Sequence, residues 1–176
     1  LHPYVLKKGI PPVGARYEPT LKCLVLPIHD NNYELQGLEL IHGDGTKVCV
    51  PGSKKTGNGL MLGDPDRSPV LGVAEGWATG VSVHTALSGL PVLVTFGCTN
   101  IGAVSKFLRP GQQAWLFADN DPAGLDAAHA VSRTLTPTGL VLVPALGDFN
   151  DVFNAGLGHT AFTSHQKALN KLLGGS

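Results

Sequence analysis

Several signals that would assign the chain to a common class are missing from its sequence. Only three of the 176 residues are cysteine, and Cys23, Cys49 and Cys98 lie too far apart to form a CxxC pair. This excludes the usual zinc-binding pattern, so we expect each cysteine to be a small buried apolar residue, as suits a reducing compartment. No apolar run approaches the roughly 18 residues of a membrane span, and no signal peptide is visible. We therefore expect a cytoplasmic protein with no membrane contact.

An excess of either charge is also absent, because 13 basic residues balance 13 acidic ones. A free-standing nucleic-acid-binding protein usually carries a clear basic excess. Any contact with DNA or RNA is therefore expected to be local, metal-assisted or shared with another domain. The first residue is Leu1 and not methionine, so we expect a fragment of a longer protein.

Glycine and proline, in contrast, are abundant, with 23 and 13 residues, which favours short elements joined by tight turns. In residues 1–68 the pattern predicts short strands at 21–28, 33–41, 47–50 and 60–62. Gly37 is expected to mark a bulge in the second of them, and the sequence Gly-Asp-Gly at 43–45 signals a hairpin. Lys54 and Lys55 lie in a polar loop, and we interpret this part of the chain as an N-terminal lobe.

Residues 69–157 alternate apolar strands with helical stretches. Strands are predicted at 70–74, 91–96, 113–118 and 140–143, and helices follow the first three of them, to about residues 87, 108 and 135. This alternation predicts an α/β fold with a parallel sheet. Sites in such sheets lie at the carboxyl ends of the strands. A last helix is expected near 161–173, within a C-terminal segment at 158–176.

Acidic residues follow three of the predicted strands. Glu75 follows the first strand, Asp119 and Asp121 follow the third, and Asp148 and Asp151 come a short loop after the fourth. These are five of the six acidic residues between 71 and 176, so the acids are concentrated on one expected edge of the sheet. Carboxylates held close together repel each other unless a cation lies between them. We therefore expect one or two Mg²⁺ or Mn²⁺ ions at this edge.

The motif Asp119-Asn120-Asp121 alone is a weak signal for a metal. Aspartates often begin helices, and Asp121 followed by Pro122 is typical of a helix N-cap with proline at the first helical position. Glu75 before Gly76 is likewise compatible with a solvated helix start. The acids become informative as a set, because chance seldom places Glu-Gly, Asp-x-Asp and Asp-x-Asn-Asp each after a strand.

Taken together, these motifs resemble the Toprim family, in the version found in bacterial DnaG-type, phage and plasmid primases. The segments that carry the resemblance are VAEGW at 73–77, TFGCT at 95–99, FADNDPAG at 117–124 and DFND at 148–151. Further segments resemble the N-terminal lobe of the primase polymerase core, which Toprim topoisomerases lack; they lie at 2–10, 24–30, 47–52 and 60–63. The resemblance covers about residues 1–157.

The resemblance implies a Toprim-type parallel sheet flanked by helices, preceded by a small mixed α+β N-terminal lobe. It implies an enzyme, the catalytic core of a DNA primase, which synthesises short RNA primers from nucleoside triphosphates on a single-stranded DNA template. In that family the carboxylates at the positions of Glu75, Asp119 and Asp121 are catalytic and bind metal, Mg²⁺ or Mn²⁺. Asp148 and Asp151 match a looser third metal motif. A helicase or another replication domain is the expected partner.

Residues near the acids are expected to contact nucleotide or DNA. We expect such contacts from Lys47, Lys54, Lys55, Gly76, Gly97 and Asn150. The three lysines fall in a segment that resembles the family's basic ridge, although a solvated loop would have the same composition. For Trp77, stacking on a base and packing in the core are both open, and core packing is favoured.

Two positions depart from the family pattern. Cellular primases have an aspartate four residues after the glutamate, where this chain has Thr79, and often a basic residue before the third acidic motif, where it has Gly147. The number of bound metals is therefore left open. Two other functions also stay open: a Toprim nuclease, which uses the same acids for hydrolysis, and a non-catalytic module that binds nucleic acid or a replication partner.

Overall fold

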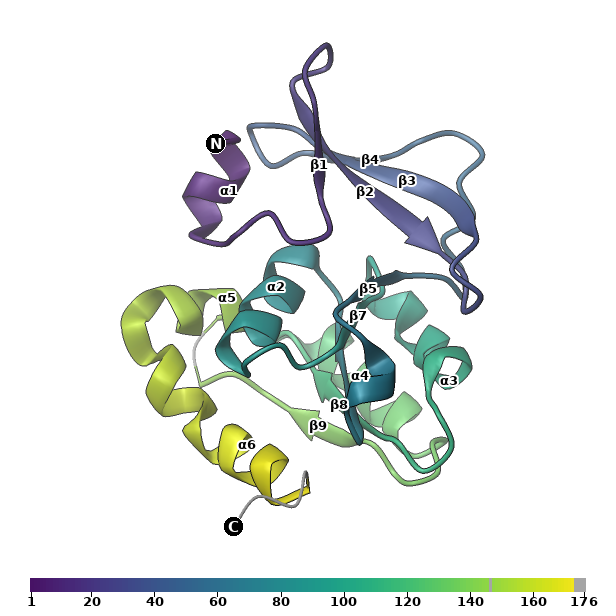
Figure 1. The fold of residues 1–176 in the computed structure, drawn as a ribbon, viewed down its shortest axis with the longest axis vertical. Helices are drawn as coiled ribbons and strands as arrows, with labels where there is room; N and C mark the ends of the chain where they lie inside the picture. Colours follow the sequence, from purple (N-terminus) through teal and green to yellow (C-terminus); the bar gives the residue numbers. More distant parts are fainter. Residues whose placement is uncertain (146, 173–176) are drawn as a thin grey trace.

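A computed structural model describes residues 1–145 and 147–172 and arranges them around two β-sheets, one above the other (Figure 1). The upper part begins with helix α1 (Pro3–Lys8) and contains a four-stranded sheet. The lower part contains a five-stranded sheet that is covered by the remaining helices. The mixed α/β architecture that the sequence predicts is therefore confirmed.

The upper sheet is antiparallel, with the order β1-β2-β3-β4. Its strands are β1 (Arg16–Glu18), β2 (Cys23–His29), β3 (Leu35–Ile41) and β4 (Lys47–Cys49). The bulge predicted at Gly37 lies one residue earlier, because Ile28 pairs with Gly37 and His29 pairs with Leu35. Gly37 instead makes room for Ser53, whose Cβ and hydroxyl occupy the space that a side chain at position 37 would fill.

The lower sheet has the order β5-β7-β6-β8-β9. Its strands are β5 (Leu60–Leu62), β6 (Val70–Ala74), β7 (Val92–Val94), β8 (Gln113–Phe117) and β9 (Leu140–Leu142). Strands β6 to β9 are parallel, as predicted, and only β5 is antiparallel to its neighbour β7. Strand β5 comes from the first 68 residues of the chain yet pairs in this lower sheet.

Along the chain, each strand of the lower sheet is followed by one or more helices. They are η1 (Pro65–Arg67), α2 (Trp77–Ala86), η2 (Cys98–Ala103), α3 (Val104–Phe107), α4 (Pro122–Ser132), α5 (Phe149–Val152), η3 (Phe153–Leu157) and α6 (Gly158–Leu172). The helix expected at 101–108 begins earlier, at Cys98, as the tighter 3₁₀ helix η2, and continues from Val104 to Phe107 as one α turn, α3. The side chain of Asn100 in η2 bonds carbonyl groups of the loop between β4 and β5.

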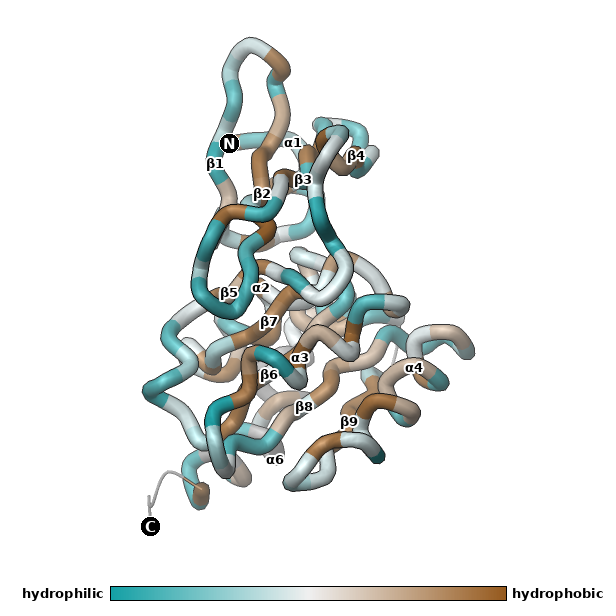
Figure 2. The backbone as a smooth tube through the Cα atoms, turned by 90° about the vertical axis from the view of Figure 1, so that its right-hand side faces the viewer, coloured by the Kyte–Doolittle hydropathy of each residue, from teal (hydrophilic) through white to brown (hydrophobic). Residues whose placement is uncertain are grey.

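Alternating residues of the lower strands pack on opposite faces of the sheet. On β8, Trp115 and Phe117 join the core on the side of α2, α5 and the upper lobe, whereas Ala114 and Leu116 join the core on the side of η2, α3 and α4. This period of two is what a strand covered on both faces requires. Figure 2 shows the hydrophobic colour along strands such as β7 and β9, between hydrophilic loops.

The first of these cores also contains upper-lobe residues, such as Leu26 and Ile28, so the two lobes share buried apolar contacts. Trp77 belongs to this core, with 1% of its surface exposed, a ring stacked on Tyr4 and an indole N–H that donates to the Val13 carbonyl. Core packing of Trp77 is thereby confirmed over base stacking. In the described ranges no helix is long and apolar enough to cross a membrane.

The expectation that all three cysteines are buried is wrong for one of them. Cys23 is fully buried in β2, and Cys98 is partly buried, but Cys49 is exposed. Cys49 lies on β4, which is one of the two edge strands of the upper sheet and has every residue exposed.

Candidate active-site cleft

Two of the predicted acids lie at the same edge of the lower sheet because their strands are neighbours. Strands β6 and β8 are parallel, and Ala74 at the end of β6 pairs with Phe117 at the end of β8. Glu75 is the next residue after β6, and Asp119 follows β8 by two residues. The convergence of these two carboxylates follows directly from the strand order.

Burial makes this acidic edge electrostatically unfavourable. The Oε1 atom of Glu75 and the Oδ1 atom of Asp119 are buried and have no hydrogen-bond partner among the described residues. Burial, and then the charges of Asp119 and Asp121, raise the pKa of Glu75 to about 7. Burial raises the pKa of Asp119 as well, followed by the charges of Asp148 and Asp121. A cation placed among these oxygens would relieve the desolvation and the repulsion together.

Asp121 begins helix α4. Its Oδ1 accepts a hydrogen bond from the backbone N–H of Gly124 at 2.9 Å, and Pro122 occupies the first turn. The capping interpretation is therefore confirmed for one of its oxygens. Gly124 also lies against the acidic edge, because a Cβ atom at this position would be 2.7 Å from Oε1 of Glu75. The glycine keeps the space beside Glu75 open.

The third acidic motif is used mainly to begin helix α5. Asp148 accepts a hydrogen bond from the N–H of Asp151, and the side chain of Asp151 accepts one from the N–H of Asp148. Asp148 also lies 3.8 Å from the amine of Lys8, at the end of helix α1. Asp148 is close enough to raise the pKa of Asp119, whereas Asp151 is exposed. Thr79 is buried in α2, so the position where cellular primases have an aspartate supplies no carboxylate here.

A cleft of about 460 Å³ lies between the two lobes, directly beside the acidic edge. The lower part contributes Glu75, Gly76, Phe96, Gly97 and Asp119. The upper lobe contributes Glu39, Lys47, Cys49 and Lys55. Six residues predicted from the sequence thus meet in one place: Lys47, Lys55, Glu75, Gly76, Gly97 and Asp119.

The lysines of the upper lobe face the acids from across the cleft. The amine of Lys47 lies near Gly76, where a Cβ atom would be 3.9 Å from its Nζ, and its charge lowers the pKa of Asp119 against the effect of burial. The amine of Lys55 lies 3.6 Å from Oε2 of Glu39. Lys54 is exposed and is not among the residues that line the cleft.

The structure does not bring Asn150 to the cleft. This side chain is 1% exposed, and its amide donates to the carbonyl of Lys8 and to the hydroxyl of Ser82. It therefore ties helices α1, α2 and α5 together inside the protein. Gly97, in contrast, lies at the cleft with a φ of 143°, a value that side-chain-bearing residues rarely adopt, and has open space around it.

Sequence reasoning missed three residues that line the cleft. Glu39 is 6% exposed, and burial raises its pKa while Lys55 and Lys47 lower it. Cys49 pairs with Glu39 across β3 and β4, so the two lie on the same face of the upper sheet. Phe96 forms part of the wall with a positive φ of 61°. An acid in the middle of an apolar strand, Gly-Leu-Glu-Leu-Ile, was the available signal for Glu39.

A larger hollow, of about 730 Å³, lies near the N-terminus, between α1 and β1. Its walls are mostly apolar, and none of the residues that line it carries a carboxylate. The smaller cleft is the candidate active site, because it holds the facing lysines and the two acids whose buried oxygens have no hydrogen-bond partner among the described residues.

The acidic edge fits a hard divalent cation. Within the described ranges, no three His, Cys, Asp or Glu side chains are grouped as a ready-made metal site. Mg²⁺ does not need such a group, because it is commonly bound through one or two carboxylates, with waters and substrate phosphates completing its shell. The unpartnered oxygens of Glu75 and Asp119, beside the space kept open by Gly124, meet that requirement.

Comparison with known proteins agrees with this architecture. A family model described as "Toprim domain" matches residues 70–158, just over half of the chain, and the match includes the acidic edge. The chain belongs to the Toprim family. The family match begins at β6 and so leaves β1 to β5 outside it.

Solved structures extend the Toprim likeness to the upper lobe. The primase fragment of the bacteriophage T7 primase-helicase is 19% identical, with a TM-score of 0.63, over 92% of this chain and 72% of that one. The Aquifex aeolicus primase (zinc-binding and RNA polymerase domains) is 15% identical, with a TM-score of 0.63, over 94% of this chain and 54% of that one. The RNA polymerase domain of Mycobacterium tuberculosis DnaG is 18% identical, with a TM-score of 0.57, over 91% and 60%. At these identities the likeness shows a shared fold, and that fold includes both lobes.

Proposed function

We propose that this chain is the catalytic core of a DNA primase, an enzyme that synthesises short RNA primers on single-stranded DNA from nucleoside triphosphates. The observation that carries the proposal is the cleft between the lobes, in which Lys47 and Lys55 face Glu75 and Asp119. Each of these two carboxylates has one buried oxygen without a hydrogen-bond partner in the described part of the chain. A triphosphate needs cations around its oxygens, and both sides of this cleft can supply them. The likeness to primase structures across both lobes supports the same function.

The proposed organisation has an N-terminal lobe at 1–68, a Toprim catalytic domain at 69–157 and a C-terminal helix and tail at 158–176. Strand β5 comes from the first of these segments and pairs in the sheet of the second. It would therefore help to fix the position of the lysine-bearing lobe over the acidic edge.

In the proposed reaction, the 3′-hydroxyl oxygen of one nucleotide bonds to the α-phosphorus of the next. The bond between the α-phosphorus and the bridging oxygen of the β-phosphate breaks, and pyrophosphate leaves. Negative charge grows on the phosphate and on the leaving group, so the amines of Lys47 and Lys55 would stabilise the transition state electrostatically. Glu75, Asp119 and Asp121 would hold Mg²⁺ or Mn²⁺, which when bound neutralises phosphate charge and aligns the reacting groups.

Glu75 fits two roles in this reaction. It can hold metal, or its carboxylate can take the proton that the 3′-hydroxyl loses. A pKa of about 7 in the metal-free site suits a general base near neutral pH, although a bound cation would lower that pKa. Asp148 and Asp151 are proposed as outer members of the site, because both already cap helix α5.

Partners are proposed by extension from similar proteins. One M. tuberculosis DnaG structure contains a double-stranded DNA oligomer with a 6-nucleotide overhang. One T7 structure contains primase domains bound to an RNA/DNA hybrid and dTTP, together with the lagging-strand DNA polymerase. We propose single-stranded DNA and nucleoside triphosphates as the substrates of this chain, and a helicase or another replication domain as its partner.

Replacement of Asp121 tests the function. Asp121→Ala is expected to abolish metal-dependent primer synthesis, measured as labelled RNA made on single-stranded DNA, without unfolding the protein. The cap of α4 is also lost, which by itself costs about 1 kcal/mol, so thermal unfolding is measured beside the activity. Asp121→Ser keeps a capping oxygen and removes the carboxylate, and it is expected to be equally inactive.

The same assay separates the alternatives. Wild-type-level synthesis by folded Asp121→Ser would refute the role of this carboxylate. Cleavage of DNA by the wild-type protein, without synthesis, would identify a Toprim nuclease. Calorimetry with Mn²⁺ completes the test, since a non-catalytic module is expected to bind no metal at the acidic edge.

A further inference from the structure

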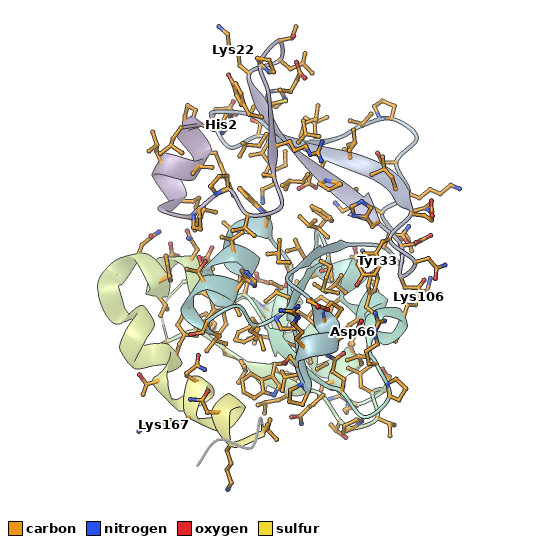
Figure 3. The ribbon with its side chains drawn as sticks, viewed as in Figure 1. His2, Lys22, Tyr33, Asp66, Lys106 and Lys167 are labelled. Carbon is orange, nitrogen blue, oxygen red and sulfur yellow. The ribbon has the colours of Figure 1, made fainter. Side chains whose placement is uncertain are left out.

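The loop between β4 and β5 brings one lysine to the cleft. Lys55 lines the cleft, whereas its neighbour Lys54 is exposed outside it. Directly after Lys55, the chain makes a turn in which the N–H of Asn58 donates to the carbonyl of Lys55. Gly57 in this turn has a φ of 77°, and the amine of Lys106 lies 2.6 Å from where its Cβ atom would be. Lys106 is labelled in Figure 3, at the side where this loop meets the lower part.

One buried side chain, Asn100, connects this turn to the lower sheet. Asn100 is 7% exposed, and its Nδ2 atom lies 2.9 Å from each of the carbonyl oxygens of Lys55, Asn58 and Thr95. Its Oδ1 atom accepts a hydrogen bond from the N–H of Gly57 at 2.7 Å. The same amide therefore bonds three residues of the turn and one residue directly after β7.

Only a primary amide of this size makes this set of contacts. The amide offers donors for the carbonyl groups and an acceptor for the N–H, whereas a carboxylate has no donor and an apolar residue has neither. Buried backbone groups that lose their partner cost free energy. The turn at 55–58 would therefore shift toward solvent in a protein without the amide of Asn100.

Lys55 is restrained at its other end as well. Its amine lies 3.6 Å from Glu39, whose side chain is only 8% exposed. A buried carboxylate needs a nearby cation, so Glu39 keeps the amine inside the cleft. A lysine held at both its backbone and its amine has lost much of its rotamer freedom before any ligand arrives, and such preorganisation strengthens binding.

We propose that Asn100 is a positioning residue for nucleotide binding, which fixes the turn at 55–58 and thereby holds the amine of Lys55 where the triphosphate binds. Asn100 itself contacts no substrate in this arrangement. The inference rests on the proposed primase function for the identity of the nucleotide, and on the hydrogen bonds of Asn100 for the mechanism.

A double-mutant cycle tests whether Asn100 acts through Lys55. The dissociation constant of Mg²⁺–ATP and the KM for nucleoside triphosphates are measured for the wild type, Asn100→Ala, Lys55→Ala and the double variant. Asn100→Ala is expected to raise both constants roughly 5- to 20-fold, and to raise them less than about 2-fold when Lys55 is already alanine. Asn100→Asp, which keeps the acceptor and loses the donors, is expected to behave in the same way and serves if the alanine variant does not fold.

Gln112 offers a matched control. It is a buried amide, 4% exposed, whose Nε2 donates to the carbonyls of Pro65 and Ser68 and whose Oε1 accepts from the N–H of Arg109. Gln112 directly precedes β8 and therefore lies at the opposite end of that strand from the cleft. Gln112→Ala is expected to lower the melting temperature about as much as Asn100→Ala while leaving the Mg²⁺–ATP affinity unchanged.

Two results would overturn the inference. One is an Asn100→Ala effect of equal size with and without Lys55, because the amide would then act on the cleft as a whole. The other is an unchanged affinity in Asn100→Ala. A wild-type protein that binds Mg²⁺–ATP with a coupled cycle but makes no primer would instead overturn the primase function and keep the role of Asn100. Primer synthesis by the wild type, together with additive effects of Asn100→Ala and Lys55→Ala, would keep the primase function and overturn the role of Asn100.

Discussion

The two sheets of this protein contribute to the cleft in different ways. In the lower, parallel sheet, Glu75 and Asp119 follow the ends of neighbouring strands, so the strand order alone brings them together. In the upper, antiparallel sheet, Glu39 lies in the middle of β3, Lys47 begins an edge strand and Lys55 belongs to a loop. In the lower half, the order of the strands therefore positions the charged side chains. In the upper half, their positions depend on the register of the strands and on how the loop before β5 is held.

The two sides also differ in electrostatics. In the lower half, Glu75 and Asp119 are partly buried, each has one oxygen without a partner among the described residues, and the pKa of each is raised. The amine-bearing side chains of the upper half are more exposed, with 38% of the Lys55 side chain accessible. Polar groups that are buried without partners cost stability, and they persist where function requires them. We therefore expect that neutralising an acid of the lower half reduces activity the most and, at the same time, makes the metal-free protein more stable.

The largest effect is expected for Asp119→Asn. Primer synthesis should fall roughly 10²- to 10³-fold, because a group that helps to neutralise phosphate charge loses its own charge. The melting temperature of the metal-free protein should rise, since a neutral amide avoids the burial and repulsion that raise the pKa of Asp119. Asp126→Asn is the matched control, because Asp126 is exposed on α4 and is not among the residues that line the cleft. A lower melting temperature of Asp119→Asn with unchanged primer synthesis would contradict this prediction.

An intermediate effect is expected for the upper half. Charge reversal of Lys54 and Lys55 together should weaken single-stranded DNA binding roughly 10-fold at low salt and flatten its salt dependence, because fewer counterions are released. Fluorescence anisotropy at several salt concentrations measures both quantities. Reversal of Lys167 and Lys171 on α6 changes the net charge equally, far from the upper lobe, and should have little effect (Figure 3). Equal weakening by both pairs would show that net charge, and not the lobe, governs binding.

The smallest effect is a pH dependence of stability. The pKa of Glu75 is raised from 4.5 to about 7 in the folded protein, so the protonated carboxyl is favoured by folding. The contribution of Glu75 to the free energy of unfolding is therefore fully present below pH 4.5 and is lost as the pH rises to about 7. Urea unfolding of metal-free protein should therefore show falling stability over this range, and Glu75→Gln should flatten the slope. Mg²⁺ should stabilise more at pH 7.5 than at pH 5, because it binds deprotonated carboxylates.

An exposed acid provides the comparison for that slope. Glu34 lies on the surface before β3, and Glu34→Gln should leave the pH dependence unchanged. If stability still falls with rising pH in Glu75→Gln, other groups of the acidic edge, such as Asp119, are responsible for the pH dependence.

Most elements of the lower sheet could be predicted from the sequence, because its strands are buried on both faces and are followed by helices with clear starting signals. The strand predicted at 70–74 is observed as β6, with the same bounds, and Pro122 begins α4 as its sequence indicates. The bulge predicted at Gly37 is found one residue earlier, because glycine at 37 is required for the close approach of Ser53 and not for the irregular pairing of β2 with β3. The exposure of Cys49 was missed because no local pattern identifies an edge strand.

The sequence by itself determined that Glu75 and Asp119 would lie at one edge of the sheet, because alternating strands and helices predict a parallel sheet whose strands have their carboxyl ends at the same edge. The tertiary structure made their strands, β6 and β8, direct neighbours. Only the tertiary structure decided which of the other polar residues join them. It placed Lys55 and Glu39 over the acids, left Lys54 outside and enclosed Asn150 between helices. These outcomes depend on long-range hydrogen bonds, such as those from Asn100 to the turn at 55–58, and no local sequence pattern encodes a bond between residues more than 40 positions apart.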